Sequence, residues 1–154
     1  MAKRYVSERP IQLSVTTRDS DFYRADIEFH GVDHSGATFE GRVFLNNSDA
    51  NEKTPKKKEE GYAGSFYIFG HGGCFGDEGH CEVPNTKRAC DLREPHALTP
   101  AEVRVPITDA LRIAMKKDPN LRVTVVPVVM ASNDKCDLEN VFKFESYDIK
   151  TYAK

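Results

Sequence analysis

Short segments in which every second residue is apolar recur along the sequence. In one of them Ile11, Leu13 and Val15 alternate with polar residues. A period of two places such side chains on one face of a β-strand, and Gly, Pro, Asn and Asp between the segments favour turns. The segments predicted as strands are residues 11–16, 24–29, 38–45, 62–69, 121–130 and 141–152.

One segment has helical spacing instead. Ile107, Ala110, Leu111, Ala114 and Met115 recur at intervals of three and four residues, which predicts an amphipathic helix over residues 107–117. Pro106 suits its start and Asp118-Pro119 its end. We therefore expect an all-β fold, an antiparallel sandwich or partly open barrel of about seven strands with one short α-helix.

The order of these segments predicts further detail. One domain over residues 1–154 accommodates all of them, because the chain is long enough for a single sizeable core. Residues 31–36 indicate a turn, so segments 24–29 and 38–45 are expected to form a hairpin. Pro127 requires a bulge or a sheet edge in its strand. The charged residues 46–61 are predicted to form a solvated loop.

Charge and hydropathy exclude several classes of partner. Lys and Arg total 22 against 24 Asp and Glu, which provides no basic field for a phosphate backbone, so nucleic acid is not an expected partner. No apolar run reaches the roughly 20 residues that cross a bilayer, and the sequence begins without a signal-like stretch. We expect a soluble chain without membrane association, cytoplasmic by default, although the sequence does not determine the compartment.

A long Cys-, His- and Gly-rich segment, residues 70–100, interrupts the strand pattern. It contains His71, Cys74, His80 and Cys81 within the run HGGCFGDEGHC. Thiolate and imidazole ligands suit copper or zinc, which makes these four residues a candidate metal site. Their spacing does not follow the paired ligands of common zinc motifs, which favours the alternative of a disulfide, such as Cys74–Cys81 or Cys74–Cys90, that pins the loop. The cysteines available for such a disulfide are Cys74, Cys81, Cys90 and Cys136.

Other chemistry finds no support in the sequence. There is no G-x-S-x-G elbow for a serine hydrolase and no Gly-Lys-Ser/Thr run for a nucleotide loop. Residues 72–114 contain no Met to complete a blue-copper site beside the cysteines. We therefore predict no catalytic residue in this chain.

The order of four motifs resembles the C-terminal, KFDV-type domain of polyphenol oxidases and tyrosinases. The resemblance extends from about Ile27 to Ile149. Its strongest elements are an Ala-Gly-Ser-Phe strand and a helix followed by a Val-Thr-Val-Val-Pro strand. The motifs are Gly41-Arg42-Val43-Phe44-Leu45-Asn46, Tyr62-Ala63-Gly64-Ser65-Phe66, Ile107-Thr108-Asp109-Ala110-Leu111 and Val123-Thr124-Val125-Val126-Pro127.

The resemblance implies a non-catalytic domain that covers the type-3 dicopper centre of a separate catalytic domain and keeps the oxidase latent. A dicopper centre of that family needs more histidines than the five in this chain, so we expect no oxidase activity from the chain alone. The resemblance also suggests copper loading through His71, Cys74, His80 and Cys81, and Phe75 as a plug for the copper pocket. The alternatives are a stand-alone copper- or zinc-binding β-domain and a disulfide-pinned interaction module.

Overall fold

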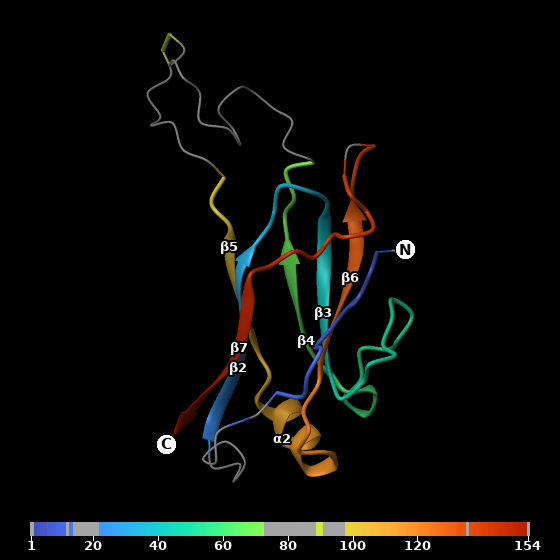
Figure 1. The fold of residues 1–154 in the computed structure, drawn as a ribbon, viewed down its shortest axis with the longest axis vertical. Helices are drawn as coiled ribbons and strands as arrows, with labels where there is room; N and C mark the ends of the chain where they lie inside the picture. Colours follow the sequence, from blue (N-terminus) through green and yellow to red (C-terminus); the bar gives the residue numbers. More distant parts are fainter. Residues whose placement is uncertain are drawn as a thin grey trace.

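The computed structural model describes residues 2–11, 13, 22–72, 89–90, 98–134 and 136–153. Two antiparallel sheets pack against each other, and a short helix lies at one end of them (Figure 1). The elements are β1 (Tyr5–Val6), β2 (Phe22–Val32), β3 (Thr38–Leu45), the 3₁₀ turn η1 (Lys58–Glu60), β4 (Tyr62–Ile68), β5 (Ala101–Pro106), α2 (Thr108–Lys117), β6 (Val123–Ala131) and β7 (Ser146–Ala153).

The strand order is β1-β6-β3-β4 in one sheet and β5-β2-β7 in the other. All strand pairs are antiparallel. Within the described part of the chain, these seven strands and one short α-helix make a sandwich that does not close into a barrel. The predicted all-β class is confirmed, and of its two forms the sandwich is the one observed.

The core between the sheets follows from the alternation in the sequence. Ala25, Ile27 and Phe29 of β2 are fully buried and face the other sheet. Phe29 contacts the rings of Phe66 and Phe142 at centroid distances of 5.5 and 5.3 Å. Each such aromatic side chain stabilises the fold by about 1.5–3 kcal/mol through burial, so these rings hold the two sheets together.

Helix α2 covers the end of the sandwich that is lower in Figure 1. Leu111 and Ala114 are its buried residues, and Ile107 just before it is also buried. The backbone N–H of Ile107 donates to the carbonyl of Ala25 at 2.8 Å, which ties the start of the helix to β2. The helix predicted over residues 107–117 is confirmed.

The predicted hairpin is wrong. β2 and β3 belong to different sheets, and β2 pairs with β5 and β7 instead. The turn between them therefore crosses from one sheet to the other. Periodicity shows which side chains of a strand are buried, but both a hairpin and a crossover satisfy the same pattern.

Other differences concern the ends of strands and short strands. β1 and β5 were not predicted. β1 has only two residues, too few to show a period. In β5 the alternating Ala101, Val103 and Val105 come directly after the irregular segment. The last strand begins at Ser146, later than expected, although Phe142 is buried in the core. Of the strand predicted over residues 11–16, Ile11 forms an isolated bridge with Leu121, and most of the remainder lies outside the described residues.

Pro127 occupies the position that its chemistry requires. It pairs with Gly41 of β3, while β1 pairs with β6 only at Thr124 and Val125. At Pro127 the strand β6 therefore has a partner on one side and an open edge on the other, so the missing N–H costs no ladder hydrogen bond. The expectation of a sheet edge is confirmed.

Candidate functional site

His34, in the crossover between β2 and β3, joins the two ends of the Cys- and His-rich segment. The backbone N–H of His71 donates to the carbonyl of His34 at 3.0 Å. The Nε2 of His34 lies 2.7 Å from the carbonyl oxygen of Thr99, to which it donates. The sandwich thus holds both the entry and the exit of residues 73–97 at one point.

The imidazole of His71 lies beside that of His34, with ring centroids 5.1 Å apart. The neighbouring Gly72 accepts a hydrogen bond from the Asn133 side chain at 2.9 Å, and the Cys136 thiol donates to Asn133 at 3.4 Å. His71 is therefore the one predicted metal ligand placed by the structure, and His34 supplies a second imidazole next to it. Sequence reasoning missed His34 because it stands alone in a turn.

The remaining predicted residues of this segment, Cys74, Phe75, His80 and Cys81, lie outside the described residues. Cys90 is exposed and Cys136 is half-buried, and both are free thiols in the structure. The metal site and the disulfide alternative through Cys74 or Cys81 both stay predictions.

A network of ion pairs covers the outer face of the β5-β2-β7 sheet. Alternation in β2 places Asp26 and Glu28 on this face, yet they are only 0 and 5% exposed. Arg24 pairs with Asp26 at 2.7 Å, and Arg104 of β5 pairs with Glu28 at 2.5 Å. Lys150 of β7 also pairs with Glu28. The cationic side chains cover the two carboxylates and compensate their charge.

His30 extends this network toward the end of β2. Its Nδ1 lies 2.5 Å from Glu102 of β5, and its Nε2 lies 3.2 Å from Asp148 of β7. Hydrogen bonds to Glu102 and then Asp148 raise the pKa of the imidazole. Glu28, His30 and Asp148 also offer one ligand atom each within 4.8 Å of one another, which makes them a candidate metal cluster.

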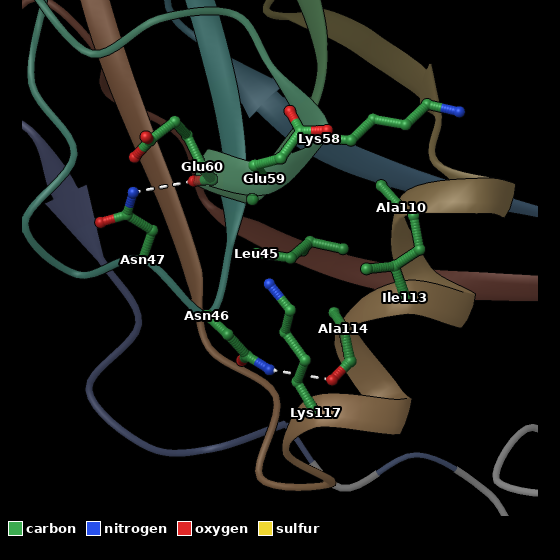
Figure 2. Close-up of a pocket in the computed structure, with 11 residues that line it drawn as sticks. Leu45, Asn46, Asn47, Lys58, Glu59, Glu60, Ala110, Ile113, Ala114 and Lys117 are labelled. Atoms are coloured by element: carbon green, nitrogen blue, oxygen red, sulfur yellow. Dashed lines mark hydrogen bonds between the residues drawn. The ribbon is translucent and has the colours of Figure 1, made fainter.

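A pocket of about 120 Å³ lies between η1 and α2 (Figure 2). Leu45 and Ala114 contribute its apolar surface, and Lys117 extends toward it from the helix. Asn46 donates to the carbonyl of Ala114 at 3.3 Å at one side. Sites for small molecules usually measure about 300–1,000 Å³, so this pocket is a seam between two elements rather than a candidate ligand site.

Within the described ranges, none of the helices has the length and apolar character that a bilayer crossing requires.

Comparison with solved structures shows a likeness of fold. Latent aurone synthase (polyphenol oxidase) from natural source matches with a TM-score of 0.51 and 17% identity, over 98% of this chain and 25% of that chain. The recombinantly expressed latent enzyme matches with a TM-score of 0.49 and 16% identity, over 97% of this chain and 24% of that chain. No family model and no curated protein matches the sequence. The chain thus spans about a quarter of the structures it resembles.

Proposed function

We propose that this chain is the non-catalytic shielding domain of a tyrosinase-like copper oxidase, and that it acts by covering the entrance of the dicopper site. The observation that carries this proposal is the likeness over 98% of this chain to 25% of latent aurone synthase. A sandwich of that size suits a regulatory part of a larger oxidase. The sequence motifs that resemble the C-terminal domain of polyphenol oxidases support the same assignment.

The side chains available in the chain also favour a non-catalytic role. The chain has five histidines in total, which is too few for the dicopper centre that the resemblance implies. Among the described residues, only Glu28, His30 and Asp148 come together as a group of three candidate ligands. Two of these are carboxylates, whereas a type-3 centre is built from imidazoles. The dicopper centre of the proposed oxidase therefore belongs to the partner domain.

The outer face of the β1-β6-β3-β4 sheet, where large apolar side chains are exposed, is the contact surface that we assign to this partner. Tyr67 and Val128 flank Glu40 from the two neighbouring strands, so both lie on the outer face. Met130 lies two residues beyond Val128, and Phe69 follows β4. Phe69 is 82% exposed and Met130 63%. Contiguous exposed apolar surface marks interaction sites on soluble proteins, and we assign these exposed side chains to such a contact.

Inhibition in trans tests the shielding role. The purified chain is added at increasing concentration to the matching catalytic domain, and phenol turnover is measured. We expect turnover to fall, and unchanged turnover at saturating concentration contradicts the proposal.

Two variants locate the contact surface. Phe69→Ser should raise the concentration for half-inhibition about tenfold or more, as expected for an interface anchor. Tyr23→Ser is the matched control, because Tyr23 is an aromatic residue of β2, in the other sheet, that is 56% exposed. Equal inhibition by both variants and the parent would move the contact elsewhere, with Phe75→Ala as the next variant to test the plug.

Copper loading is the second part of the proposal. The pair of imidazoles from His34 and His71 lies at the base of the segment that carries Cys74, His80 and Cys81. Imidazole and thiolate together are donors that suit copper, so the residues present fit the ion. We expect the copper-loaded chain to reconstitute a copper-free catalytic domain faster than free copper does, and His71→Ala to slow this transfer. Thiol counting before and after chelation distinguishes bound metal from a disulfide.

A further inference from the structure

The ion-pair network on the β5-β2-β7 sheet contains a group of potential metal ligands that the shielding role does not use. Each of Glu28, His30 and Asp148 places one ligand atom within 4.8 Å of the other two. They come from two adjacent strands, because β2 and β7 pair with Glu28 opposite Asp148. From this geometry we propose that the three residues form a binding site for Zn²⁺.

Glu102 holds the imidazole in the orientation that a metal site needs. His30 Nδ1 lies 2.5 Å from a Glu102 oxygen, while Nε2 faces Asp148 at 3.2 Å. A histidine that ligates a metal through one ring nitrogen commonly donates the other N–H to a carboxylate. Without an ion, each ring nitrogen faces a carboxylate oxygen, so both N–H groups donate. Zn²⁺ would replace the proton on Nε2, while the Nδ1–H stays on Glu102 and keeps the ring oriented with Nε2 toward Asp148.

The donor set selects the kind of ion. One imidazole nitrogen and two carboxylate oxygens suit Zn²⁺, and three protein ligands leave a fourth position for water. The site contains no thiolate, which separates it chemically from the Cys74 and Cys81 segment. The side chains of His30 and Asp148 are 30 and 48% exposed, so an ion can reach the ligands from solvent.

Lys150 is the direct competitor for this position. Its ammonium pairs with Glu28, and Arg104 pairs with the same carboxylate at 2.5 Å. The Lys150 side chain is 48% exposed, so the ammonium can move into water when an ion binds. Arg104 stays on the other oxygen of Glu28. Zn²⁺ binding therefore displaces the Lys150 ammonium from Glu28 and the proton from His30 Nε2, so the two charges of the ion replace two positive charges already at the site. Removal of Lys150 should strengthen binding.

Calorimetric titration of the full chain with ZnCl₂ tests the site. All four cysteines, Cys74, Cys81, Cys90 and Cys136, are replaced by Ser throughout, so that thiolates do not contribute. We expect one Zn²⁺ per chain, with an affinity that falls about tenfold or more in His30→Gln and in Asp148→Asn. Glu102→Gln should weaken binding about 10–100-fold, as for other partners of a ligating histidine.

Two further variants make the result specific. Lys150→Gln should bind Zn²⁺ several-fold more tightly, and such a gain cannot come from misfolding. Glu52→Gln, which removes an exposed carboxylate of the charged loop, should leave the affinity unchanged. The proposal is overturned if the parent binds no Zn²⁺, if His30→Gln and Asp148→Asn bind as tightly as the parent, or if Lys150→Gln brings no gain. The titration needs no oxidase partner, so its failure leaves the shielding proposal intact.

Discussion

Glu40 carries a buried negative charge on the outer face of the β1-β6-β3-β4 sheet, and this charge should make stability depend on pH. Its side chain is only 7% exposed, and Arg42 pairs with it at 2.9 Å. Lys56, from the charged loop that follows β3, also pairs with it. Burial raises the pKa of Glu40, but hydrogen bonds from Lys56, Ser65 and Arg42 outweigh burial and lower the pKa from 4.5 to about 2.

The sign and size of the effect follow from this pKa. Because the folded pKa lies below the unfolded one, the stabilisation is present above about pH 4.5 and is lost as the pH falls toward 2. The separation between 4.5 and about 2 corresponds to about 3 kcal/mol in the free energy of unfolding at pH 7. By pH 3, about 1 kcal/mol of it should remain.

Urea unfolding of the parent and of Glu40→Gln, followed by circular dichroism at pH 7, 5 and 3, measures this contribution. The difference between the two proteins isolates Glu40, because all other carboxylates titrate in both. Glu52→Gln serves as the control and should cost less than about 0.5 kcal/mol at every pH. A stability difference of the same size at pH 3 and pH 7 would refute the electrostatic argument and assign the effect to packing.

Two core positions give simpler predictions. Gly41→Ala places a Cβ 2.2 Å from the ring of Phe66, so we expect a loss of about 1–3 kcal/mol in unfolding free energy. Gly36→Ala, where a Cβ meets nothing within 4 Å, should change little in the same urea titration. Leu111→Ala removes a fully buried side chain of α2 and should cost about 2–5 kcal/mol. A loss below about 1 kcal/mol would show that the helix is not anchored by Leu111.

The strands that sequence reasoning located are those defined by neighbouring residues, through apolar alternation and the turn residues that end it. Alternation up to Leu45 and the turn residue Asn46 define β3, which is observed as Thr38–Leu45. The helix is similar, because Pro106 and Pro119 bracket its apolar face. Which strands pair with each other depends on residues far apart in the sequence, and the hairpin prediction failed for that reason. β2 pairs with β5, which follows it after two further strands, and with β7, which follows it after four further strands and the helix.

The two candidate sites also differ in how far apart their residues lie in the sequence. His71 was recognised because Cys and His residues crowd around it in the sequence. The spacing of Glu28 and His30 places them on one face of β2, but this pattern is common in exposed strands. Their partners Glu102 and Asp148 lie 72 and 118 residues from His30 in the sequence. Only the register of three strands brings these four side chains together.

The hydrogen bonds of His34 imply that the sandwich and the Cys- and His-rich segment can be separated. His71 and Thr99 both bond to His34, so a short Gly-Ser linker can replace residues 73–97 without moving either end. Shortening a loop from about 25 to about 5 residues lowers its closure cost by about 1.4 kcal/mol. The shortened chain should therefore unfold at a urea concentration equal to or above that of the parent, and a clear loss of stability would show that the segment contributes to the core.

The same shortened chain separates the two parts of the proposed function. It lacks Cys74, His80, Cys81 and the proposed plug Phe75 but keeps the exposed Phe69. If the outer face of β4 and β6 covers the oxidase, inhibition in trans persists while copper transfer is lost. If inhibition is lost although the sandwich is folded, shielding depends on the segment, and Phe75 rather than Phe69 is the residue to test as its anchor.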